Sequence, residues 1–90
     1  MRALYTESAY RDIGDILSRV AADKPGSAAD VARAIKATIA RLRSFPELGT
    51  KTNKPGIYMQ IARPFDYLIF YRIVGDTLVI QHVRHPSINK

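Results

Sequence analysis

The side chains best suited to chemistry in this 90-residue chain are basic, and most of them stand in its second half. Lysine and arginine bind phosphates and carboxylates, and histidine can exchange a proton near neutral pH. The candidates are Lys51, Lys54, Arg63, Arg72, Arg84 and His85. With Tyr58, Tyr67 or Tyr71 available for stacking, they could form a binding surface for RNA or an acidic peptide. For any one of them, a solvated surface charge is the more ordinary role.

Other kinds of site have weaker support. His82 and His85 are three residues apart on an expected strand, so they point to opposite faces, and the chain has no cysteine. Asp12 and Asp15 are one helical turn apart, but solvated charges on an outer helix face are the usual case. His85 ends a strand without a second catalytic group at a fixed spacing, which favours a structural role. We expect no metal and no cofactor.

A β-hairpin must position most of the basic residues. Residues 67–74 and 77–85 are rich in β-branched and aromatic side chains, and the Gly75–Asp76 connector fits a type II′ turn. Val74 and Thr77 would flank this turn, which fixes the antiparallel register. The opposed pairs are then Arg72 with Val79, Phe70 with Gln81, and Leu68 with Val83.

Alternation assigns the hairpin side chains to two faces that are both largely apolar. One face carries Leu68, Phe70, Arg72, Val74, Val79, Gln81, Val83 and His85. The other carries Tyr67, Ile69, Tyr71, Ile73, Leu78, Ile80, His82 and Arg84. A hairpin that is apolar on both sides predicts helices over one face and a partner over part of the other.

The first half of the chain predicts a short strand and two helices. Arg2–Tyr5 reads as the strand, and Thr6 can cap a first helix. Its apolar stripe is Ala9, Ile13, Ile16, Leu17 and Val20. Gly14 weakens this helix and suggests the close approach of a neighbouring element. Because the connection between the helices is short, they should form an antiparallel hairpin.

The second helix begins at an expected capping box, Ser27–Asp30. The apolar stripe of this helix is Val31, Ala34, Ile35, Thr38, Ile39 and Leu42. From the two helices together, the residues expected to pack on the sheet are Ile13, Leu17, Ile35 and Ile39. Residues 50–56 form a polar loop, Ile57–Ala62 a strand, and the residues after Pro86 a frayed tail. The fold class is therefore α+β: a short strand, a helical hairpin and three antiparallel strands (β-α-α-β-β-β).

Composition limits the protein's context. The chain, residues 1–90, is long enough for one modest domain, and no apolar run reaches the roughly 20 residues of a membrane helix. We expect a cytoplasmic protein, since there is no cysteine and no secretory signal pattern. A net charge of +6 predicts an acidic partner.

Taken together, these features resemble the RelE/ParE superfamily of bacterial type II toxins. The resemblance rests on the order of several segments rather than on one motif. These are the first-helix opening 6–13, Leu42 followed by Phe45-Pro46-Glu47-Leu48-Gly49, Pro55-Gly56, and the hairpin segments 67–73 and 80–85. It implies a helical hairpin on a twisted antiparallel sheet and an acidic antitoxin that is partly disordered alone and folds when it binds.

The branches of the superfamily differ in target. RelE-like members cleave messenger RNA on the ribosome with a basic cluster and a tyrosine or similar group near the C-terminus, whereas ParE-like members inhibit DNA gyrase by binding it. This chain departs from the RelE pattern, because the residues after His85 include no tyrosine and no arginine. It also has Ile57-Tyr58 after Pro55-Gly56, where many relatives of both kinds carry an arginine. The functional role of that arginine would then fall to Arg63, Arg72 or Arg84.

The resemblance therefore favours a ParE-type toxin of a plasmid-stabilisation system that arrests growth by binding gyrase. Its expected target- or antitoxin-binding residues are Tyr58, Arg63, Arg72, Arg84 and His85. The first alternative is a ribosome-dependent endoribonuclease that uses Lys51, Lys54, Arg63, Arg72, Arg84 and His85. The second is a basic RNA-binding module without catalytic activity.

Overall fold

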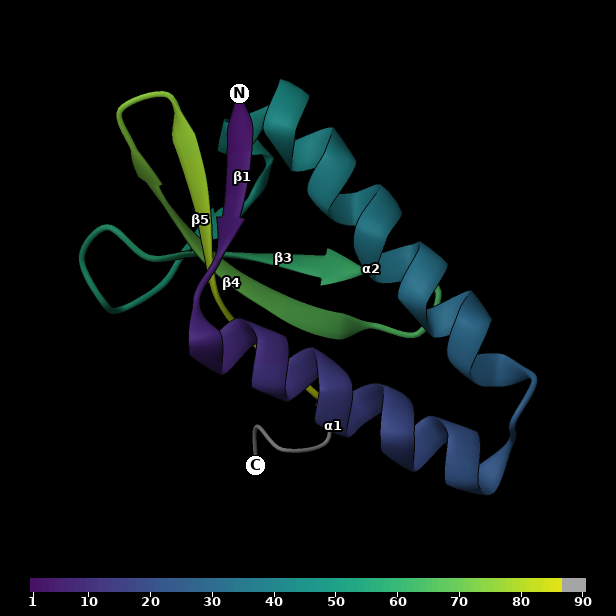
Figure 1. Ribbon diagram of the computed structural model, residues 1–90. Helices are drawn as coiled ribbons and strands as arrows, with labels where there is room; N and C mark the ends of the chain where they lie inside the picture. The colour runs from purple at the N-terminus through teal and green to yellow at the C-terminus, as the bar shows by residue number, and fades with distance from the viewer. Residues whose placement is uncertain (87–90) are drawn as a thin grey trace.

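The computed structural model describes residues 1–86, so the expected frayed tail after Pro86 lies outside the described residues. Two helices follow a short strand, and the remaining strands complete one sheet (Figure 1). The elements are β1 (Arg2–Tyr5), α1 (Glu7–Asp23), α2 (Ser27–Ser44), the 3-10 turn η1 (Pro46–Leu48), β2 (Thr50–Lys51), β3 (Tyr58–Ala62), β4 (Tyr67–Val74) and β5 (Thr77–Arg84). The α+β class is confirmed.

The sheet has the strand order β1-β5-β4-β3-β2. The last three strands in sequence, β3, β4 and β5, pair antiparallel, as expected, whereas β1 pairs parallel to β5. The polar segment 50–56 also differs from expectation, because its first two residues form β2 and pair with Met59 and Tyr58. Two residues are too few to show a periodic sequence pattern.

Helix α2 covers one face of the sheet and supplies the helical part of the core. Its buried residues are Val31, Ile35, Thr38, Ile39 and Leu42, and they pack with sheet residues that include Ile69, Leu78 and Ile80. The capping box is wrong, however. Gly26 is the N-cap and Ser27 is already helical, so the Ser27 hydroxyl makes no capping bond, and Asp30 pairs with Arg33 instead.

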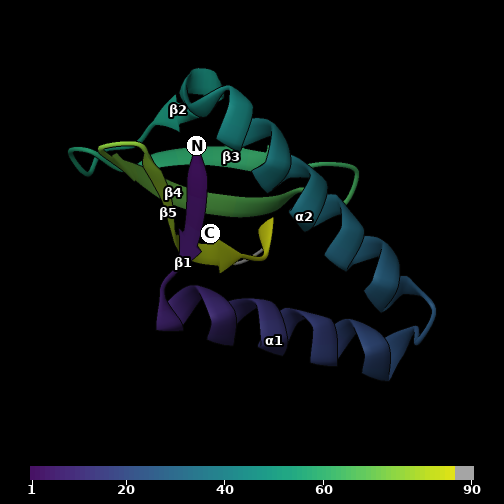
Figure 2. The same cartoon turned by 45° about the horizontal axis from the view of Figure 1, so that its top comes forward.

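Helix α1 is held less deeply. Thr6 caps it as expected by accepting a hydrogen bond from the Ala9 amide, and Ala9 is its one fully buried residue. Ile13 and Leu17 are only partly buried against the core. Figures 1 and 2 show the two helices meeting at the turn after Asp23 and diverging from it, with α1 along the end of β5. Nothing lies within 4 Å of a Cβ built on Gly14, so the expected close approach is wrong.

The hairpin turn agrees with a type II′ turn, since Gly75 has a φ of 61°. The predicted register holds from Val74–Thr77 to Tyr71–Ile80 and then shifts by one residue. Phe70 pairs with His82 and Leu68 with Arg84, so the predicted pairs Phe70–Gln81 and Leu68–Val83 are wrong. An extra residue in β5 at Gln81 forms a bulge that the turn chemistry does not reveal.

The bulge exchanges the faces of the last β5 residues. Val83 joins the helix-covered face opposite Ile69 and is 2% exposed, whereas His82 and Arg84 move to the other face opposite Phe70 and Leu68. The assignment of Val83 and Arg84 in the sequence analysis is therefore reversed. This reversal brings both basic side chains to the open side of the sheet.

Candidate functional site

The face of the sheet opposite α2, called the open face here, carries apolar side chains on four strands. Paired residues share a face in a sheet, so this surface can be followed through the register from Leu4 to Met59. Its members on β1, β5, β4 and β3 are Leu4, Val79, His82, Arg84, Leu68, Phe70, Arg72, Met59 and Ile61. Leu4 is 49% exposed, and Phe70, Val79, Met59 and Ile61 are partly exposed.

A hollow of about 280 Å³ lies on the open face beside the loop after β2. Basic and aromatic side chains line it together: Lys54 from the loop, Phe70 from β4, and His82 and Arg84 from β5. The loop also contributes Thr52, Asn53 and Ile57, and Gln81 completes the lining. The hollow therefore offers two permanent cations above an aromatic surface, an arrangement that suits an acidic or phosphate-bearing ligand.

The other basic residues from the sequence analysis do not join this hollow. Arg72 is on the open face but farther along β4, opposite Val79. Arg63 lies in the turn before β4, where it forms an ion pair of 3.1 Å with Asp66. His85 makes an edge-on contact with the Tyr67 ring, 5.3 Å between centroids. Lys51 lies in β2, next to Thr52 of the hollow, but it pairs with Tyr58 and therefore shares the opposite face of the sheet with Tyr71.

The tyrosines belong mainly to the interior. Tyr71 is fully buried, and its hydroxyl donates to the Pro46 carbonyl at 2.7 Å and accepts from the Gly49 amide at 3.0 Å. Burial raises the pKa of Tyr71, although the Gly49 hydrogen bond lowers it in part. Tyr58 is partly buried and stacks on Tyr71, and Tyr67 is 6% exposed. In this structure, therefore, the buried Tyr67 and Tyr71 rings cannot stack on an external base.

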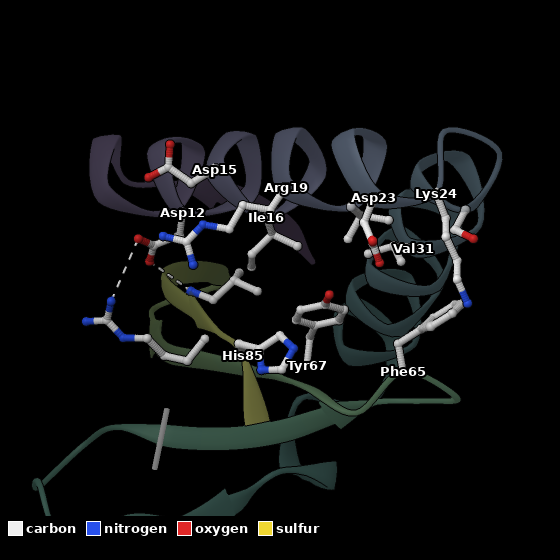
Figure 3. Close-up of a pocket in the computed structure, with 14 residues that line it drawn as sticks. Asp12, Asp15, Ile16, Arg19, Asp23, Lys24, Val31, Phe65, Tyr67 and His85 are labelled. Atoms are coloured by element: carbon white, nitrogen blue, oxygen red, sulfur yellow. Dashed lines mark hydrogen bonds and ion pairs between the residues drawn. The ribbon is translucent and has the colours of Figure 1, made fainter. Parts of the chain in front are cut away.

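Asp12 on α1 ties the helix to the end of β5 (Figure 3). Its Oδ2 accepts a hydrogen bond from the Val83 amide at 3.1 Å and lies 3.2 Å from His82 Nδ1. Its Oδ1 is 3.8 Å from the Arg84 guanidinium. Strand β1 pairs with β5 only as far as Ile80, and Thr6 bonds the Gln81 carbonyl beyond it. Asp12 thus takes the place of a neighbouring strand at this edge.

The sequence analysis missed this contact because it placed Asp12 on the solvated side of the helix. Its carboxylate side chain is only 18% exposed. A signal for the contact exists in the sequence: Asp12 is three residues after Ala9 and four before Ile16, so it falls within the apolar stripe. A carboxylate at a stripe position needs a polar partner on the surface that the helix covers.

A second hollow of about 650 Å³ separates α1 from the ends of β4 and β5. Figure 3 shows Ile16 and Asp23 of α1 on one side of it and Tyr67 and His85 on the other. Its rim mixes acidic side chains (Asp12, Asp15 and Asp23) with basic ones (Arg19, Lys24, Arg84 and His85). Because the charges oppose one another, this hollow does not select a ligand of one sign.

Among residues 1–86, no group of three or more His, Cys, Asp or Glu side chains could hold a metal ion. No helix in that part of the chain is long and apolar enough to cross a membrane. The arrangement best suited to function is thus the open face, with its apolar strip, the cations Lys54, Arg72 and Arg84, and the hollow beside Phe70.

Comparison with known families identifies the family of the chain. The model of the ParE toxin of the type II toxin-antitoxin system, parDE, matches residues 3–89. The chain belongs to the ParE toxin family. The resemblance to RelE/ParE toxins is therefore confirmed, and the protein is a type II toxin by family. No match is found among curated proteins.

A solved structure shares the fold of this ParE-family chain. It is described as the chromosomal ParDE TA system from P. aeruginosa, and it superimposes with a TM-score of 0.84. The match covers 94% of this chain and 95% of that chain at 17% sequence identity. At this identity the likeness concerns the fold, so the use of individual ParE side chains must be argued from the present chain.

Proposed function

We propose that this ParE-family toxin inhibits DNA gyrase by binding it, and that a cognate acidic antitoxin neutralises it by covering the open face. Family membership supports the toxin role. The observation that carries the surface assignment is the uneven packing of the sheet. Helix α2 buries one apolar face, whereas on the opposite face Leu4, Phe70 and Val79 remain at least partly exposed among residues 1–86. An acidic, partly apolar segment fits a surface of this composition.

The charges on the open face support the same assignment. Lys54 and Arg72 form no ion pair within the described part of the chain, whereas Arg63 is paired with Asp66 and Arg84 is within 3.8 Å of Asp12. Unpaired cations beside exposed apolar side chains attract an acidic partner and raise its association rate. Of the expected binding residues, Arg72 retains this role in the proposal because it is unpaired, and Arg84 because it lines the hollow on the open face. Tyr58, Arg63 and His85 serve local structure in the proposal.

A second candidate function has one specific observation in its favour. Lys54, His82 and Arg84 surround one hollow, where cations and an imidazole could act on a phosphodiester. Against RNA cleavage, the other candidates are dispersed: Lys51 shares the helix-covered face with Tyr58, Arg63 lies in a turn and His85 lies against Tyr67. In addition, His82 Nδ1 and the Arg84 guanidinium face Asp12. These contacts support binding over catalysis.

The two functions separate in one pair of assays. Purified toxin is added to a gyrase supercoiling reaction, with and without the antitoxin, and transcripts are mapped in cells after toxin induction. Binding to gyrase predicts loss of supercoiling, recovery with antitoxin, and intact transcripts. Ribosome-dependent cleavage of transcripts with supercoiling unchanged would contradict the proposal and select the nuclease.

A double variant sharpens this assay. The test variant combines Lys54→Ala and Arg84→Ala, which removes both permanent cations of the hollow beside Phe70. The matched control combines Arg19→Ala and Lys24→Ala, which removes two cations from the rim of the hollow beside α1. If the hollow binds RNA for cleavage, only the first pair abolishes transcript cutting. If the toxin works by binding proteins, the first pair weakens antitoxin or gyrase binding without any change in transcripts.

A further inference from the structure

Two large apolar side chains stand exposed at the turn η1, where α2 ends and the chain runs toward β2 (Figure 2). Phe45, the C-cap of α2, is 64% exposed, and Leu48, the last residue of η1, is 52% exposed. The Leu48 amide donates to the Phe45 carbonyl at 3.1 Å, and residues three apart in a 3-10 turn project from the same side. This pair, called the η1 patch here, is apolar surface that contributes nothing to the core.

The turn that carries the η1 patch is fixed to the interior of the protein. The buried Tyr71 hydroxyl donates to the Pro46 carbonyl and accepts from the Gly49 amide, so it bridges the two ends of η1. The approach is so close that a Cβ built on Gly49 would overlap this hydroxyl. Because the backbone is already ordered, the patch loses little conformational freedom when it binds a partner.

The charges beside the η1 patch are mainly basic. Arg41 and Arg43, in the last turn of α2, are exposed and form no ion pair within residues 1–86. The Arg43 Nε is held in place, since it donates to the Met1 carbonyl at 2.9 Å. Glu47 is the one acidic side chain between residues 41 and 51. A partner with carboxylates around an apolar pocket is therefore complementary to this region.

The η1 patch and the open face belong to different sides of the sheet. Tyr71, which holds η1, packs in the core beneath α2 on the covered face. However, Thr50 follows η1 at once and pairs with Met59 of the open face. A large protein that encloses the patch thus also meets the rim of the open face, where a bound antitoxin excludes it.

We infer that Phe45 and Leu48 insert into an apolar pocket with an acidic rim on the folded target of the toxin, which is gyrase in the proposed function. The inference rests on that function and adds the toxin residues that recognise the target. Protruding side chains on a fixed turn complement a preformed pocket, whereas a segment that orders on binding fits a groove or a sheet face. A second copy of this chain is a poorer occupant, because a symmetric contact would bring Arg41 and Arg43 of both copies together.

The first test combines Phe45→Ser and Leu48→Ser. The toxin concentration that half-inhibits gyrase supercoiling should rise at least about 30-fold, as expected for loss of two anchor side chains. The antitoxin Kd and the unfolding temperature should stay close to those of wild type, since both side chains are exposed and lie away from the open face. The matched control combines Tyr10→Ser and Phe65→Ser, which removes two other exposed aromatic side chains and should leave inhibition nearly unchanged.

The second test reverses one charge beside the patch. Arg41→Glu should weaken gyrase inhibition by about 3- to 10-fold at low salt and less at high salt, because a like charge then faces the acidic rim. Lys36→Glu is the matched control, an exposed cation earlier on the same helix that forms no ion pair within residues 1–86. Equal effects of the two variants would overturn the acidic rim.

The outcomes distinguish this inference from the proposed function. If wild-type toxin fails to inhibit gyrase, the proposed function fails and the inference fails with it. If wild type and the Phe45→Ser, Leu48→Ser variant inhibit equally, the proposed function stands and the inference alone is overturned. A variant that folds but loses antitoxin binding would assign the patch to the antitoxin and overturn the inference as well.

A free wild-type toxin whose mass doubles with concentration, while that of the variant does not, would assign the patch to a second copy and also overturn the inference. Should the double variant fail to fold, methyl NMR of wild type decides. Gyrase should broaden the Leu48 methyl signals and the antitoxin should leave them nearly unchanged. Leu48 signals that do not respond to bound gyrase overturn the inference.

Discussion

The two faces of the β4–β5 hairpin are nearly equal in apolar character, yet they are buried to very different extents. On the helix-covered face, Ile69, Leu78 and Ile80 are completely buried. On the open face, Phe70 and Val79 remain partly exposed and Arg72 is exposed. The difference arises because α2 packs on one side only. Sequence composition alone could not distinguish a core face from a binding face here.

This contrast explains how one hairpin can serve both stability and recognition. Burying apolar area stabilises the fold only where a covering element excludes water. The open-face side chains can gain most of that stabilisation only when a partner arrives, so they contribute more to binding than to folding. Substitutions on the two faces should therefore separate stability from affinity.

The largest expected effect is in the core. Leu78→Ala on the covered face should lower the free energy of unfolding by about 2–5 kcal/mol, because it leaves a cavity at a fully buried position. Its neighbour Val79→Ala, on the open face, should cost less than about 1 kcal/mol. Urea denaturation followed by circular dichroism measures both. Equal losses for the two variants would remove the distinction between the faces.

Tyr71→Phe tests the polar contacts on the covered face. The Pro46 carbonyl and the Gly49 amide both lose their partner, so we expect a loss of about 1–3 kcal/mol in the free energy of unfolding. Tyr58→Phe, which keeps the stacked ring without a hydrogen bond of this kind, is the control and should change stability little. A neutral Tyr71→Phe variant would show that the contacts of this hydroxyl are not needed.

The same hydroxyl predicts a pH dependence. Burial raises the pKa of Tyr71 above its ordinary value of 10.0, and burial raises that of Tyr5 as well. Their contribution to stability is therefore complete below pH 10.0 and is lost as the pH rises through the folded-state pKa. Wild type should lose stability in alkali more steeply than Tyr71→Phe, as followed by thermal melts and tyrosinate absorbance. Identical alkaline profiles would contradict this assignment.

Asp12→Ala should have a smaller effect, about 1–2 kcal/mol, since the Val83 amide can partly recover a hydrogen bond to water. Asp15→Ala, one turn away on an exposed position, is the matched control and should be within about 0.5 kcal/mol of wild type. Chemical denaturation compares the two. If both variants behave alike, α1 is not held to β5 through Asp12.

The smallest effect on stability is expected for Arg72→Ala. The side chain is exposed and unpaired in the described structure, so the free energy of unfolding should stay within about 0.5 kcal/mol. Antitoxin binding should weaken several-fold, chiefly through a slower association rate at low salt. Stopped-flow kinetics at two salt concentrations measures this. Unchanged association would place the binding surface away from Arg72.

Most of the fold follows from local sequence signals. The Thr6 cap, the helix stripes, the Gly75 turn and the alternation of β4 each agree with the structure. The bulge at Gln81 could not be predicted in the same way. The bulge lies where β5 continues past the end of β1 and contacts α1 instead. Such a tertiary contact leaves no local signal in the sequence.

The candidate site was predictable only in part. The sequence identified Lys54, Arg72 and Arg84 by type, but placing Arg84 on the open face required the bulge. Tyr58 was expected among the binding residues; in the structure it is partly buried and stacks on Tyr71. Residue type indicates what chemistry a side chain can do, and only packing determines which face presents it.

The most direct test of the open face is methyl NMR of the isotope-labelled toxin titrated with the antitoxin. The account predicts that shifts concentrate at Met59, Ile61 and Val79 on the open face. Ile35 and Leu42 of α2, which are buried against the covered face, should move little. Shifts confined to Ile16, Val20 and Val31, which line the hollow beside α1, would place the antitoxin elsewhere and contradict the central claim.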